Sequence, residues 1–199
     1  MNDAPPLRVL AISGSLRRAS SNTALLEAAA LLAPAGMTIE RYDELGELPH
    51  FNPDRERDDW PAVDRLRRAV HGADGLLFST PEYARGLPGS LKNALDWLVG
   101  GCEITHKPCA IFHASPSSVH AVASLVETLR TMSCRLVDEA SITVSLRSTT
   151  LDAQGIAAHP DAAPVIVRAL TAFARAIEAY RVDPGYLPPV RHEPDPSQV

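Results

Sequence analysis

Residues 13–23 are rich in hydroxyl, amide and guanidinium groups, which are the groups that bind a phosphate. The segment follows a short apolar run and precedes a helix-forming stretch. Its polar groups would therefore lie at a helix N-terminus, where unpaired N–H groups and a partial positive charge favour an anion. The spacing is neither GxxxxGK(S/T) nor GxGxxG, which disfavours a nucleoside triphosphate site and a Rossmann dinucleotide site. The alternative is a capped loop with solvent-exposed arginines. The candidate donors are Ser15, Arg17, Ser20, Asn22 and Thr23.

Residues 80–89 form a second candidate segment, with two prolines and two glycines. Such a composition fixes an unusual backbone path, which can turn peptide N–H and C=O groups toward a planar polar heterocycle. Tyr83 could add a flat apolar edge. The alternative is a rigid loop whose Tyr83, together with Trp97 in the following helix, only completes the core.

Predicted strands and helices alternate along the chain, and they would position these two segments. Such alternation predicts βαβ units, a parallel sheet and helices on both of its faces, in three α/β/α layers. In a sheet of this kind, ligands bind outside the carboxyl ends of the strands. We expect one domain over residues 1–182 and a proline-rich tail over 183–199. The apolar runs predict strands at 7–13, 37–42, 75–79, 108–113 and 141–144, and helices at 22–33, 61–71, 90–99, 119–132 and 161–181.

Composition excludes several classes of protein. The 199 residues carry 24 acidic and 19 basic side chains, so no basic stripe for a nucleic acid or an anionic membrane is expected. Three cysteines favour a reducing compartment over a disulfide framework. No signal peptide or membrane span is recognisable, so we expect a cytoplasmic protein. His106, His113 and His120 fall on different elements, and no metal site is expected.

Two motifs together resemble a known family. GSLRxxSxN after the first strand and PEY followed by PGxLKNxxDW after the third are similar to the signature of the NADPH-dependent FMN reductases. This flavodoxin-like group includes quinone, azo-dye and chromate reductases. The resemblance covers about residues 7–180. The matching residues are Gly14, Ser15, Leu16, Arg17, Ser20 and Asn22, and then Pro81, Glu82, Tyr83, Pro88, Gly89, Leu91, Lys92, Asn93, Asp96 and Trp97.

The resemblance implies a flavodoxin-like, doubly wound, five-stranded parallel sheet that binds FMN. NADPH would pass a hydride to the flavin, and a small-molecule acceptor such as a quinone would take two electrons. No catalytic side chain is expected. The resemblance also implies a homodimer or a dimer of dimers, with the helix of Lys92 and Trp97 near the interface. The expected cofactor-binding residues are Ser15, Arg17, Ser20, Asn22 and Thr23 for the phosphate and Pro81, Glu82, Tyr83 and Ala84 around the ring, together with Ser21, Arg85 and Ser115.

Two departures from the family pattern keep an alternative open. Ala84 stands where the family usually has Asn, and residues 114–120 contain no glycine where a Gly-Gly pair is common. The alternative is a flavin-binding electron carrier or sensor that turns over no NADPH. A weaker one is a flavodoxin-like domain without a cofactor, which acts through its surface.

Overall fold

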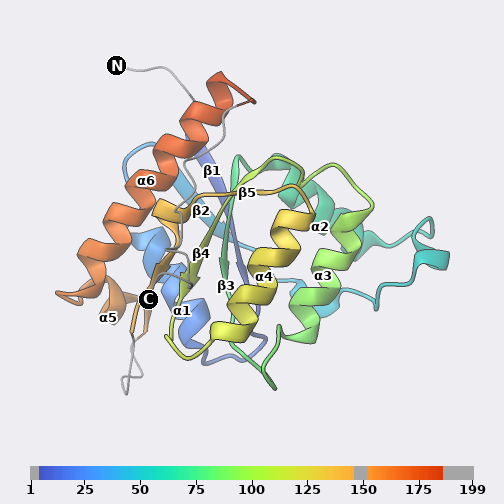
Figure 1. Cartoon of the computed structure of the whole chain (residues 1–199), viewed down its shortest axis with the longest axis horizontal. Coiled ribbons are helices and arrows are strands. Elements are labelled where there is room, and N and C mark those ends of the chain that lie inside the picture. Colours follow the sequence, from blue (N-terminus) through green and yellow to red (C-terminus); the bar gives the residue numbers. More distant parts are fainter. Residues whose placement is uncertain (1–4, 146–151, 186–199) are drawn as a thin grey trace, which may run out of the picture.

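The sheet is parallel and has the order β2-β1-β3-β4-β5, with β6 also paired to β4 (Figure 1). The computed structural model describes residues 5–145 and 152–185. The strands are β1 (Leu7–Ser13), β2 (Met37–Arg41), β3 (Gly75–Ser79), β4 (Pro108–His113), β5 (Arg135–Leu136) and β6 (Ile142–Thr143). The α-helices are α1 (Ser21–Leu31), α2 (Pro61–Gly72), α3 (Gly89–Val99), α4 (Val119–Thr131), α5 (Ala153–Ala157) and α6 (Ala162–Val182).

Alternate residues of the central strands supply two separate cores, one on each face of the sheet. Val9 of β1 packs with α1 and α6, whereas Leu10, the next residue, packs with α2, α3 and α4. This alternation follows from the two-residue period of a strand. The helices therefore form two outer layers, with α1, α5 and α6 on one side of the sheet and α2, α3 and α4 on the other (Figure 1). The predicted three-layer parallel α/β fold is confirmed.

The fifth strand differs from the prediction, because it is broken in two. The stretch 141–144 contains only β6, and β5 was missed. Between them a 3₁₀ turn, Asp138–Ala140, interrupts the strand, and pairing to β4 continues on either side of it. The backbone N–H of Val137 donates to Cys109 O at 2.8 Å, and that of Val144 donates to His113 O at 2.7 Å. Five positions across the sheet thus hold six strands.

Two helical details also differ from the sequence expectation. α1 begins at Ser21, one residue before the predicted start, because Ser20 is its N-cap. α5 was not predicted; it is a single turn of helix, capped by Asp152. Of the predicted tail at 183–199, residues 186–199 lie outside the part of the chain that the structure describes. The domain boundary at 182 therefore stays a prediction.

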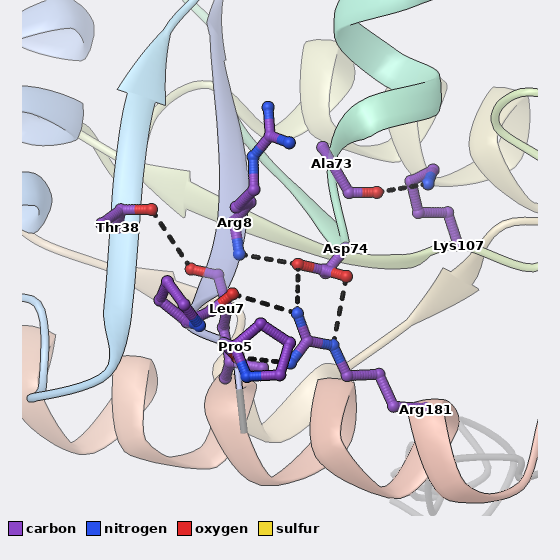
Figure 2. A network of polar contacts seen from close by, with 9 residues as sticks. Pro5, Leu7, Arg8, Thr38, Ala73, Asp74, Lys107 and Arg181 are labelled. Carbon is purple, nitrogen blue, oxygen red and sulfur yellow. Dashed lines mark hydrogen bonds and ion pairs between the residues drawn. The ribbon is translucent and has the colours of Figure 1, made fainter. Parts of the chain in front are cut away.

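At the amino edge of the sheet, Arg181 of α6 joins the start of the chain to the start of β3 (Figure 2). Its guanidinium donates to both carboxylate oxygens of Asp74, at 3.1 and 2.7 Å, and to the carbonyls of Pro5 and Pro6, at 2.9 and 3.0 Å. Asp74 also accepts from the N–H of Arg8 at 2.7 Å. One side chain thus fixes α6 against the amino ends of two strands, on the side of the sheet away from the candidate ligand loops.

We expect Arg181→Ala to lower the free energy of unfolding by about 2 kcal/mol, because it leaves a half-buried Asp74 carboxylate without its cation. Arg181→Lys should recover only part of the loss, since an ammonium cannot form the bidentate contact. Urea denaturation measures both. Arg175→Ala, which removes an exposed arginine of the same helix, is the matched control. Equal stability of the two alanine variants would contradict the role given to Arg181.

Candidate functional site

The first ligand loop runs from the end of β1 into α1 and leaves helix N–H groups free. The Ser20 hydroxyl accepts from the N–H of Thr23 at 3.3 Å, as an N-cap does. The Thr23 hydroxyl in turn lies 2.8 Å from that of Ser13 at the end of β1. Within the described residues, no group accepts from the N–H of Ser21 or Asn22. The helix therefore begins with its two outermost donors available to an anion.

A cavity of about 500 Å³ opens beside this helix start. Most of the predicted phosphate-binding residues line it, namely Ser15, Arg17, Ser20, Ser21 and Thr23. Arg18 lines it as well. Neither Arg17 nor Arg18 forms an ion pair with a described residue, whereas Arg41 on the same wall is paired with Glu27 and Asp43. The unpaired cations and the free N–H groups together suit a dianionic phosphate.

Tyr42, just beyond β2, supplies a feature of this cavity that the sequence reasoning missed. Tyr42 lines the cavity and is buried, and its hydroxyl has no hydrogen-bond partner among the described residues. Burial, with the nearby Glu44, raises its pKa to about 12. A buried donor without a partner is costly unless a ligand satisfies it. Its position at the carboxyl end of a predicted strand was the signal that could have found it.

Asn22 connects the first loop to the second. Its side-chain oxygen accepts from the Ser79 hydroxyl at 2.9 Å, and the N–H of Gly14 donates to Ser79 O at 2.8 Å. A Cβ at Gly14 would lie 2.5 Å from the hydroxyl oxygen of Thr80, so only glycine allows this close approach. The ends of β1 and β3 are thereby held together, and the two candidate loops leave the sheet side by side.

The second loop carries a tight two-residue turn. Tyr83 and Gly86 exchange both backbone hydrogen bonds, at 3.1 and 3.0 Å. Ala84 and Arg85 between them have φ of 49° and 60°, as a type I′ turn requires. Tyr83 is 48% exposed, so the alternative in which it completes the core is wrong for this residue. It is right for Trp97, which is fully buried.

Glu82 ties the second loop to the third. One oxygen of its carboxylate accepts from the N–H groups of His120 and Ala121, at 2.8 and 3.0 Å, in the first turn of α4. In the third loop, the Ser115 hydroxyl accepts from the N–H of Ser117 at 3.3 Å and lies 2.7 Å from the Ser117 hydroxyl. The N-terminus of α4 thus already holds a carboxylate, and the N-terminus of α1 is the better place for a ligand's phosphate.

The candidate residues therefore fall into two sets. The cavity collects the first-loop set except for Asn22, whose oxygen holds the loops together. The second set belongs to neighbouring loops at the same edge and does not line this cavity: Pro81, Glu82, Tyr83, Ala84, Arg85 and Ser115. Asp152 and Ala153 at the start of α5 also line the cavity, and nothing in the sequence indicated them.

The second motif has a positioning role in the structure. Asn93 of α3 accepts from the N–H of Phe51 at 2.8 Å and donates to Pro49 O at 2.9 Å. The indole N–H of Trp97 donates to the same carbonyl at 2.7 Å. The segment that they hold follows Leu45, a residue of the cavity wall. Lys92 and Asp96 instead form an exposed ion pair along the helix.

His113 ends β4 and is largely buried, which lowers its pKa below the usual value of 6.5. The unfolded chain therefore binds a proton at a higher pH than the folded chain does. We expect the free energy of unfolding to fall as the pH drops below 6.5, down to the lowered pKa of His113. Urea denaturation between pH 7 and 5 measures this slope. His113→Gln should flatten it, and His71→Gln, which changes an exposed histidine, should not; equal slopes in both would contradict the assignment.

Over residues 5–145 and 152–185, no three His, Cys, Asp or Glu side chains gather in an arrangement that could hold a metal ion. In the same residues, no helix has the length and apolar character needed to cross a bilayer. The three cysteines are free thiols, and Cys109 and Cys134 are buried.

Comparisons with known proteins agree with this geometry. The sequence profile of the NADPH-dependent FMN reductase family matches residues 7–147. An NAD(P)H-dependent FMN reductase of Pseudomonas aeruginosa is 39% identical over 155 residues, which are 75% of this chain and 83% of the relative. A quinone reductase of Pseudomonas putida is 35% identical over 144 residues, 67% of this chain and 76% of the relative. The flavoenzyme NAD(P)H:(acceptor) oxidoreductase FerB from Paracoccus denitrificans superposes with a TM-score of 0.70 at 28% identity, covering 87% of this chain and 98% of that one.

Proposed function

Because the chain belongs to the NADPH-dependent FMN reductase family, we propose that it binds FMN at the carboxyl edge of its sheet and oxidises NAD(P)H. The acceptor in this proposal is a small molecule, a quinone or a free flavin. The observation that carries it is the cavity at the start of α1, where a helix start with free N–H groups and two unpaired arginines meet. This donor set fits the phosphate end of FMN.

In this proposal each group has a defined task. The N–H groups of Ser21 and Asn22 and the guanidinium of Arg17 hold the phosphate dianion. The loops that carry Tyr83 and Ser115 lie beside the ring. When bound, FMN supplies a ring that accepts a hydride from the nicotinamide and yields two electrons to the acceptor. No side chain is required as a general base.

We propose further that the working unit is a homodimer or a dimer of dimers in the cytoplasm. Large apolar side chains are exposed at the carboxyl edge, namely Leu16 on the first loop, Tyr83 on the second and Val119 at the start of α4. Single exposed apolar residues are ordinary, but three at one edge suit a surface that a second copy covers. Sedimentation of the purified protein tests the assembly.

The experiment that tests the function is a visible absorption spectrum of the purified protein with FMN, before and after NADPH. We expect FMN to co-elute with the protein and its visible absorption to bleach when NADPH is added without oxygen. With a quinone present, NADPH should be consumed over many turnovers. A protein that binds no FMN contradicts the proposal. A protein that binds FMN but completes no second turnover with any acceptor supports the electron carrier or sensor instead.

A further inference from the structure

The arginines at the carboxyl edge of the sheet differ in what they are free to bind. Arg41 is already paired with two carboxylates. Arg17 and Arg18 line the cavity at the start of α1. Arg85 is exposed on the tight turn of the second loop, outside that cavity, and forms no ion pair with any residue that the structure describes. Arg85 is therefore a free cation at this edge that lies outside the cavity proposed for the FMN phosphate.

The backbone under Arg85 is unfavourable for an arginine. Both central residues of the turn, Ala84 and Arg85, have positive φ, a region in which a Cβ crowds the neighbouring carbonyl oxygen. Type I′ turns favour Asn or Asp followed by Gly for this reason. Glycine at position 85 would adopt this φ without strain. The requirements of folding therefore do not account for the guanidinium.

The turn is also held firmly at its base. Tyr83 and Gly86 close it with two backbone hydrogen bonds, and Glu82 before it is bound to the first turn of α4. The same contact fills the α4 N-terminus with a carboxylate, so a second phosphate at this edge cannot use that helix start. Near the ring loops, the arginine that remains to bind such a phosphate is Arg85.

We propose that Arg85 binds the 2′-phosphate of NADPH and so makes the protein prefer NADPH to NADH. The inference rests on the proposed function, since it takes NAD(P)H as the reductant. A reductant has to enter and leave in every turnover, which suits an exposed cation better than a buried one. A guanidinium forms two parallel hydrogen bonds with a phosphate, and NADH offers no group at this position.

The test compares wild type with Arg85→Gly, Arg85→Lys and Arg175→Ala, each loaded with FMN. We expect Arg85→Gly to lower kcat/KM for NADPH by roughly 10-fold or more at low ionic strength, with kcat/KM for NADH within about 2-fold. Arg85→Lys should retain part of the preference. Arg175→Ala removes the same charge from the exposed face of α6 and should leave both values unchanged. Equal losses with both reductants, or no loss, would overturn the proposal.

Two further readouts separate this role from others. Arg85→Gly should melt at or above the wild-type temperature, because the strained Cβ is gone, and its affinity for FMN should not change. A fall in FMN affinity would place Arg85 at the cofactor and overturn the proposal. Binding of adenosine 2′,5′-bisphosphate and of 5′-AMP, measured by calorimetry, needs no turnover. Wild type should prefer the bisphosphate, and Arg85→Gly should lose that preference. If wild type oxidises neither reductant, the proposed function fails, and the calorimetric comparison still decides the role of Arg85.

Discussion

Trp97→Ala is expected to lower the free energy of unfolding by about 4 kcal/mol. The Trp97 side chain is fully buried, its ring meets that of Phe51 edge to face at 5.1 Å, and its N–H donates to Pro49 O. Removing the ring opens a large cavity and leaves that carbonyl with one donor fewer. Trp97→Phe keeps most of the packing and should cost about 1–2 kcal/mol. Urea denaturation of both variants measures the difference, and equal losses would show that the ring packing kept by phenylalanine contributes nothing.

The hydrogen bonds that Asn93 and Trp97 form with residues 49–51 should also affect the affinity for FMN. The segment that they hold is continuous with Leu45 in the cavity wall. Asn93→Ala removes two hydrogen bonds to that segment, and we expect a several-fold weaker affinity for FMN. Lys92→Ala, one residue away on the same helix, disturbs only an exposed ion pair and serves as the control. If Asn93→Ala destabilised the fold and left the FMN affinity unchanged, Asn93 would be a structural residue only.

Arg17→Ala is expected to weaken FMN binding by roughly 10-fold or more at low salt. Arg17 lines the cavity together with Ser21, whose N–H is free, and has no described carboxylate partner. A charge-assisted contact with a phosphate dianion is the interaction that the alanine would remove. Quenching of flavin fluorescence on titration with the protein gives the affinity directly, without turnover.

Riboflavin supplies the matched control for Arg17, since it has the same ring and ribityl chain but no phosphate. The affinity of wild type for riboflavin should be low, and Arg17→Ala should not lower it further. The loss for FMN should also shrink as salt is raised. A variant that weakens FMN and riboflavin equally would place Arg17 at the ring or in the fold, and not at the phosphate.

The strands and helices that could be predicted are those whose own residues show the hydrophobic pattern of the element. β3 and β4 were predicted residue for residue, because each is a continuous apolar run buried on both faces. β5 and β6 have two residues each, too few to show a period, and they exist because β4 offers them partners. α5 is likewise a single turn whose main contacts are with α1, far earlier in the sequence.

The candidate site divides in the same way. The first-loop donors could be identified because a helix cap and its preceding loop are local, and the structure gathers them in one cavity. Roles that depend on distant partners could not be identified. Glu82 resembled a ring contact, yet its carboxylate binds the N–H groups of His120 and Ala121, 38 and 39 residues further on. The carbonyl that Trp97 binds belongs to Pro49, 48 residues earlier in the chain.

The broken fifth strand also determines how copies of the protein can associate. An edge strand offers unpaired N–H and C=O groups to any passing strand, which is the usual start of aggregation. At one edge of this sheet, two-residue strands on either side of a 3₁₀ turn are too short to template a new partner. At the other edge, β2 ends in the exposed charges Glu40 and Arg41. Association of copies should therefore use helix and loop surfaces and not a sheet continued from one molecule into the next.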